Sequence, residues 1–294
     1  MMTEQGSGLI VPARGRHYTG ILKRKPWDYQ LTVAIPHIET PEMLRVCVAL
    51  LRCQTMRPYI LIIDTGSTSP ESLATLADLA GEDCEAHYLR SHGWRHASEP
   101  VAVAMDLAMC LCRTREMITT HADCFLTARA AVEDLYIRAS LGGSPFAGYR
   151  LTDRDHWRFP DDRPCKDYRW MLGHTFSLID VGFCRANGIQ WDLSAGCRVM
   201  GWEWGTAATP NIVDTEVFFN YGIRDCGIDP LIIGEEKNYQ RNRNAHFDHV
   251  RSAPSAQLYL SPQHELRKKQ DRWKKIALRE ARGRLREWGG EETA

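Results

Sequence analysis

The chain has 294 residues, of which 37 are Lys or Arg and 37 are Asp or Glu, so its formal net charge is zero. This length is enough to bury one large hydrophobic core, and the charge balance excludes a uniformly basic or acidic protein. The segment 265–288 nevertheless holds ten Lys or Arg against four Asp or Glu. Its charge of about +6 leaves the remainder near −6, so we expect this tail to form a separate surface.

The ten cysteines are dispersed and form no C-x-x-C pair. Such usage is typical of a reducing compartment rather than of a disulfide scaffold. The first twenty residues lack an apolar segment behind a basic start, and no stretch approaches the roughly 18 apolar residues of a membrane span. We therefore expect a cytoplasmic protein with no transmembrane segment.

Strand-like and helix-like segments alternate through the first half of the chain. The predicted strands are 31–36, 59–64, 85–90 and 116–123, and the predicted helices are 41–54, 71–80 and 98–112. This alternation is typical of a parallel α/β sheet. Ligands of such sheets bind outside the carboxyl ends of the strands, where Asp64, His92 and Asp123 fall. These residues would form one site if their strands are neighbours.

The second half is less regular. Residues 142–170 are rich in Gly, Pro, Asp and Trp, which predicts irregular surface with one or two strands. We then expect a helix ending at Gly188, a helix at 214–227 and a strand at 229–234. In the tail, Ala277, Ala281, Leu285 and Trp288 recur at helical spacing, which predicts a helix that docks one face and exposes a cationic one.

An ordered series of motifs resembles glycosyltransferase family 2, the nucleotide-sugar enzymes of the GT-A fold. The matching segments are "VAIPHIETPEMLRVCVALLRCQT", "LIIDTGSTS", "THADCF", "ANGIQWD", "DTEVFFNYGIRDCGIDPLII" and "FDHVRS". The resemblance implies a Rossmann-like, mostly parallel sheet flanked by helices over residues 31–252. It divides into a nucleotide-binding half, 31–125, and an acceptor half, 126–252. Residues 1–30 are then an N-terminal extension, and 253–294 a basic helical appendage.

The chain departs from the family motifs at several positions. His121 replaces the first acid of the D-x-D motif, Cys124 replaces the acid after it, and Thr65 replaces the second acid of D-D-G-S. The family's E-D pair corresponds to Asp214 and Glu216 with a threonine between them. A degenerate, weakly active homologue is one alternative that these changes permit.

The resemblance also implies a binding site for the nucleotide-sugar donor. Its predicted residues are Pro36, His37, Asp64, Gly66, His92, His121 and Asp123. Asp123 and a late histidine, His249 or alternatively His246, would hold Mn²⁺ or Mg²⁺ against the leaving diphosphate, and His121 is assigned to the ribose or phosphates. The plainer alternative is that Asp123 caps a helix starting near Thr127 and that Asp64 only shapes a turn.

By the same resemblance, the general base is Asp214 or Glu216, with Asp214 preferred, at the start of a predicted helix whose dipole favours an ionised carboxylate. The alternative role for Asp214 is that of an N-cap. Trp202 and Trp204 precede this helix, and an indole face suits a sugar or a base, so either could form the acceptor wall. Core packing is the alternative for each tryptophan.

The sequence therefore predicts a metal-dependent transfer of sugar from a nucleotide diphosphate, with UDP favoured, to an unidentified acceptor with inversion. A nucleotidyltransferase is one alternative. Another is a polyanion-binding protein with a degenerate GT-A domain, because the tail 265–288 suits nucleic acid or an anionic membrane surface. A nucleic-acid acceptor, such as a modified DNA base held by the tail, is a special case of the glycosyltransferase reading.

Overall fold

The computed structural model describes residues 18–21, 29–89, 98–152, 171–191, 216–237, 241–250 and 264–292. Four parallel strands form the centre of its main sheet, in the order β4-β3-β2-β5. They are β2 (Leu31–His37), β3 (Tyr59–Asp64), β4 (Cys84–Leu89) and β5 (Glu116–Thr119). β2 and β3 are buried at every residue, and their near-continuous apolar runs are typical of a parallel sheet that is covered on both faces.

The sheet continues on both sides of this centre to eight strands, β1-β4-β3-β2-β5-β8-β7-β9. The added strands are β1 (Tyr18–Ile21), β7 (Phe146–Thr152), β8 (Leu172–Asp180) and β9 (Leu231–Lys237). β1 and β8 run antiparallel to their neighbours, and β9 runs parallel to β7. A second sheet joins β10 (Asn242–Arg243), β11 (Phe247–His249) and β6 (Cys124–Leu126).

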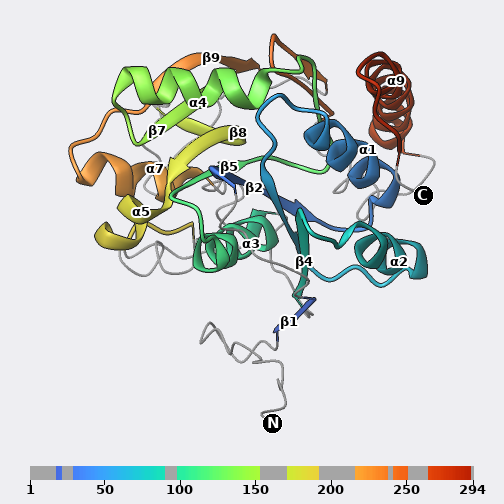
Figure 1. Ribbon diagram of the computed structural model, residues 1–294, viewed down its shortest axis with the longest axis horizontal. Coiled ribbons are helices and arrows are strands. Elements are labelled where there is room, and N and C mark those ends of the chain that lie inside the picture. The colour runs from blue at the N-terminus through green and yellow to red at the C-terminus, as the bar shows by residue number, and fades with distance from the viewer. Residues whose placement is uncertain are drawn as a thin grey trace.

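Helices cover both faces of the main sheet (Figure 1). One hydrophobic cluster includes side chains of α1 (Pro41–Arg52), α2 (Pro70–Leu79), α4 (Ala131–Gly142) and α9 (Glu265–Glu287). The other includes side chains of α3 (Ser98–Leu111), α5 (Val181–Asn187) and α7 (Glu216–Asp225). In β2, Val33 and Ile35 face the first cluster and Ala34 faces the second, as the period of two in a strand requires.

The predicted α/β class is confirmed, with helices flanking the sheet and a basic helix at the end of the chain. In Figure 1, α9 lies beside α1, and the two helices are in contact. Within the described residues, no helix combines the length and apolar character needed to cross a membrane.

Two sequence predictions were wrong around Asp123. The fourth strand ends at Thr119 rather than at 123, because the Cys124 amide donates to the His121 carbonyl at 3.1 Å and closes a turn. No helix starts near Thr127, whose amide instead donates to the His246 carbonyl at 2.9 Å. Asp123 therefore lies in a turn between two strands and does not cap a helix.

The later elements agree with the predictions except at their boundaries. The predicted helix ending at Gly188 is α5, which starts only at Val181 because the residues before it belong to β8, and Gly188 has φ of +65° as a glycine terminus requires. Helix α7 and strand β9 follow in the predicted order.

Candidate functional site

Pairing between β6 and β11 brings a late histidine to the turn that carries Asp123. The register places His249 opposite Cys124, and the Val250 amide donates to the Asp123 carbonyl at 3.0 Å. As a result, His249 Nε2 lies 3.4 Å from Asp123 Oδ1. Backbone hydrogen bonds in the small sheet thus fix the distance between two side chains that are remote in sequence.

His121 completes a group of three metal-ligand types. One ligand atom each from His121, Asp123 and His249 lies within 4.8 Å of the others. The two rings, of His121 and His249, have centroids 5.4 Å apart. Two imidazole nitrogens and one carboxylate oxygen at these distances can share one divalent cation. The sequence predicted the Asp123–His249 pair but assigned His121 to the ribose or phosphates.

Glu236 holds the orientation of His249. Its Oε1 lies 2.8 Å from His249 Nδ1, and both side chains are buried. A carboxylate on one ring nitrogen fixes the tautomer and directs the other nitrogen, here Nε2, toward the ligand group. Glu236 lies on β9, and sequence reasoning missed it because it is the middle of three consecutive charged residues, Glu235 to Lys237, and no signal separates it from its neighbours.

The charges around His249 favour its protonated form. Burial lowers its pKa, but Asp123 and Glu236 outweigh burial and raise the pKa to about 9. A cation at this position would therefore displace a proton from His249. The adjacent Cys124 contributes no charge, because burial raises the pKa of its thiol well above the usual value.

A second polar contact extends the site toward α7. The ring of His174, on β8, lies with its centroid 4.5 Å from that of His121, and its Nδ1 is 3.0 Å from Glu216 Oε2. Glu216 is fully buried at the first residue of α7. His174 was also missed by sequence reasoning, because no family motif covers its strand.

Asn220 fixes α7 against β8 and so positions Glu216. Its amide nitrogen donates to the carbonyls of Leu172 and Glu216, and its Oδ1 accepts from the Leu172 amide at 2.7 Å. All of these atoms are buried, so the clamp resists separation of helix and strand. Trp191 stacks on Phe219 at 4.0 Å and meets the His174 ring edge-on, which closes the apolar side of this contact.

The residues on β2 and β3 that the sequence predicts to bind the nucleotide sugar form one buried hydrogen-bond network. Asp64 is fully buried and accepts from His37 Nδ1 at 2.7 Å and from the amides of Gly66 and Ser67. The Thr40 amide donates to His37 Nε2, so the ring proton resides on Nδ1. Both Asp64 oxygens thus hold the loop itself, while Gly66 adopts a φ of +113° that only glycine readily accepts.

Of the remaining predicted site residues, the structure describes only His246 and Pro36. His246 lies outside the ligand group, because its ring nitrogens contact the Tyr149 hydroxyl at 2.6 Å and Asp134 Oδ2 at 2.7 Å. Pro36 is buried at the end of β2, beside the network just described. The others lie outside the described residues: His92, Trp202, Trp204 and Asp214.

Comparisons with known proteins find similar solved structures but no family. No protein-family model and no curated protein matches the sequence. Two solved structures of S. aureus TarS are similar to it. The one of residues 1–349 has 8% identity and a TM-score of 0.49, and the match covers 83% of this chain and 69% of that chain. The longer one has 10% identity and a TM-score of 0.48, and this chain spans 42% of its length and is itself covered to 83%.

A third similar structure is the mannosyltransferase PcManGT from Pyrobaculum calidifontis, in complex with GDP-Man and Mn²⁺. It has 11% identity and a TM-score of 0.45, and the match covers 90% of this chain and 77% of that chain. At such identities and TM-scores, none of these likenesses assigns an activity to this chain.

Proposed function

We propose that this protein is a metal-dependent glycosyltransferase that moves a sugar from a nucleotide diphosphate, with UDP favoured, to an acceptor. The observation that carries the proposal is the convergence of His121, Asp123 and His249 just beyond the carboxyl end of β5. This edge is where ligands of parallel α/β sheets bind. The buried Asp64 network lies at the carboxyl ends of β2 and β3. Of these two strands, β2 is the neighbour of β5 in the sheet.

The metal-ligand group of His121, Asp123 and His249 fits Mn²⁺ better than Mg²⁺. Mg²⁺ prefers oxygen ligands and keeps several waters, whereas two imidazoles suit a first-row transition metal. Asp123 and His249 would hold the cation, with His121 as the third ligand and Glu236 orienting His249. When bound, such a cation neutralises the charge that builds on the leaving diphosphate.

Glu216 is our candidate for the general base, with Asp214 as the other. Glu216 begins α7, and its contact with His174 places it next to the His121 ring. A single carboxylate base suits direct displacement with inversion. Glu216→Gln, or else Asp214→Asn, should lower turnover more than tenfold, and if neither does, this assignment of the base is wrong.

The proposal is tested by calorimetric titration of UDP, GDP, CDP and TDP into the protein, with Mn²⁺ and with EDTA. We expect one nucleotide to bind in the presence of Mn²⁺, to bind weakly or not at all in EDTA, and to lose its metal dependence in Asp123→Ala. The matched control is Asp134→Ala, which removes an acidic residue outside the ligand group. Absence of binding by all four nucleotides would contradict the proposal.

A further inference from the structure

The apolar face of α9 is already used within the protein. Its buried side chains pack with α1 and β6 in the first hydrophobic cluster. They are Ala277, Leu278, Ala281 and Leu285, with Trp273 and Trp288 partly buried beside them. Whatever binds the outer face of α9 therefore meets a helix that is fixed in place and whose buried apolar stripe already packs in the core.

That outer face carries a stripe of cations, which we call the α9 stripe: Lys268, Arg272, Lys275, Arg279 and Arg286. All five side chains are exposed. At about 100° per residue they fall within about 60° of one another around the helix axis, on the side away from Ala281. From first to last they span about 27 Å along the axis, at a rise of about 1.5 Å per residue.

Most of the stripe has no internal countercharge. Among the described residues, Arg272, Lys275, Arg279 and Arg286 form no ion pair, and only Lys268 pairs with Glu265, at 2.7 Å. Other cations of the helix are neutralised: Lys274 and Arg282 contact Glu42 of α1 at 3.6 Å and 3.2 Å. Uncompensated like charges in a row favour an external anion.

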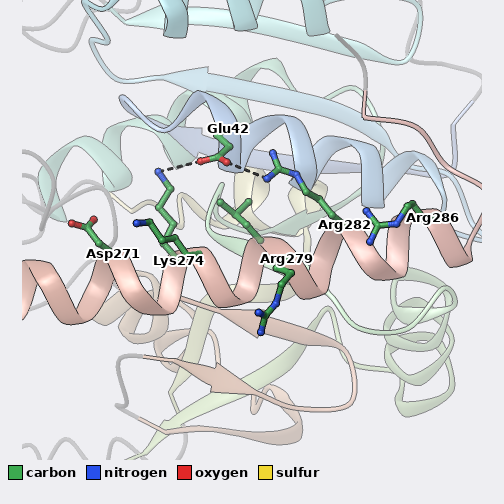
Figure 2. A pocket seen from close by; sticks show the side chains of 8 residues that line it. Glu42, Asp271, Lys274, Arg279, Arg282 and Arg286 are labelled. Atoms are coloured by element: carbon green, nitrogen blue, oxygen red, sulfur yellow. Dashed lines mark hydrogen bonds and ion pairs between the residues drawn. The ribbon is translucent and has the colours of Figure 1, made fainter.

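Figure 2 shows this division of the charges. Lys274 and Arg282 turn toward Glu42, whereas Arg279 points away from α1. Between the two helices lies a hollow of about 420 Å³, lined in part by Lys275, Arg279 and Arg286 of the stripe. It shares no residue with the His121–Asp123–His249 group, so it is a separate site.

We propose that the α9 stripe binds the phosphate backbone of duplex nucleic acid. A straight, rigid row of cations about 27 Å long matches the axial length of about eight base pairs, which present regularly spaced phosphates. An anionic membrane would attract the same charges, but a membrane-binding amphipathic helix also inserts an apolar face, and α9 has committed its own to the core. This inference does not depend on the glycosyltransferase proposal.

The test measures binding of a labelled duplex DNA of about 20 base pairs by fluorescence anisotropy, from about 50 mM to about 200 mM NaCl. Five phosphate contacts predict a slope of log K against log salt near −4.5, so affinity should fall roughly 500-fold over this range. Arg272→Gln, Lys275→Gln and Arg279→Gln together should bring the slope to about −2. The melting temperature should stay unchanged, because these exposed side chains have no partner in the described structure.

The matched control removes three exposed arginines elsewhere: Arg57→Gln, Arg138→Gln and Arg224→Gln. This variant has the same net charge as the stripe variant and should retain the wild-type slope. Equal losses in both variants, or no loss in the stripe variant, would overturn the inference. So would binding to phosphatidylcholine–phosphatidylserine vesicles without binding to DNA, which would assign the stripe to a membrane surface.

Discussion

His246 and His249 differ by three positions in sequence yet have different surroundings. His249 has one ring nitrogen on Glu236 and the other near Asp123, whereas both nitrogens of His246 are taken by Tyr149 and Asp134. A histidine can donate a lone pair to a metal only from a nitrogen that is not already committed. The hydrogen bonds therefore distinguish a ligand from a structural histidine where the residue type does not.

This distinction predicts opposite outcomes for the same substitution. His249→Gln should weaken Mn²⁺ binding by more than the roughly 10–100-fold that loss of an outer partner costs. His246→Gln should retain Mn²⁺ binding but lower the free energy of unfolding by about 1–3 kcal/mol, because the partners of a buried imidazole lose hydrogen bonds. Calorimetry with Mn²⁺ and urea unfolding measure the two effects. Loss of Mn²⁺ binding in His246→Gln alone would reverse our assignment.

At the scale of elements, the long buried strands could be predicted and the short ones could not. Near-continuous apolar runs predict β2 and β3, and α1 begins at Pro41 as expected. β6 and β11 have three residues each, and their pairing depends on tertiary context that local sequence does not carry. That pairing sets the distance between Asp123 and His249, so the sequence predicts both residues as ligands but not their geometry. The contacts of His174 and Glu236 depend on the same tertiary context and could not be predicted either.

The loop after β2 contains a carboxylate that organises the start of α2. Glu39 accepts from the amides of Thr68 and Ser69, just ahead of Pro70, and from the Ser72 hydroxyl in the first turn of α2. Burial raises its pKa, but these hydrogen bonds outweigh burial and bring the pKa to about 2. The loop after β2 thus supplies a hydrogen-bond acceptor for backbone amides at the start of α2, the helix that follows the neighbouring strand β3.

Glu39→Gln should lower the free energy of unfolding by about 1 kcal/mol at neutral pH, as loss of a helix cap does. Because the folded pKa is depressed, the contribution of Glu39 is complete above its unfolded pKa of 4.5 and disappears as the pH falls toward about 2. The difference between wild type and variant should therefore narrow across this window. Urea unfolding at neutral pH and near pH 3 measures it, and a difference independent of pH would contradict the role of the charge.

On the scale of the whole molecule, an early strand and the last helix of the described chain both pack against the predicted GT-A region, residues 31–252. β1 extends the main sheet at β4, and α9 packs on α1 and β6. Arg241 links the second sheet to α9 by contacting Asp248 of β11 and Glu280 of α9. The sequence predicts an appendage at 253–294, but the shared core of α1 and α9 predicts that α9 unfolds with the sheet rather than before it.

Leu285→Ala tests that coupling. Leu285 is 3% exposed in the cluster shared with α1, so its truncation should cost about 2–5 kcal/mol through lost transfer energy and the cavity left behind. Leu141→Ala is the matched control, because Leu141 is 84% exposed and its loss should change stability by about 0.5 kcal/mol or less. In urea, followed by circular dichroism and tryptophan fluorescence, the Leu285 variant should unfold in one transition at a lower midpoint. A separate early transition confined to the helical signal, with the main midpoint unchanged, would show instead that α9 is only loosely attached and that its packing contributes little to the core.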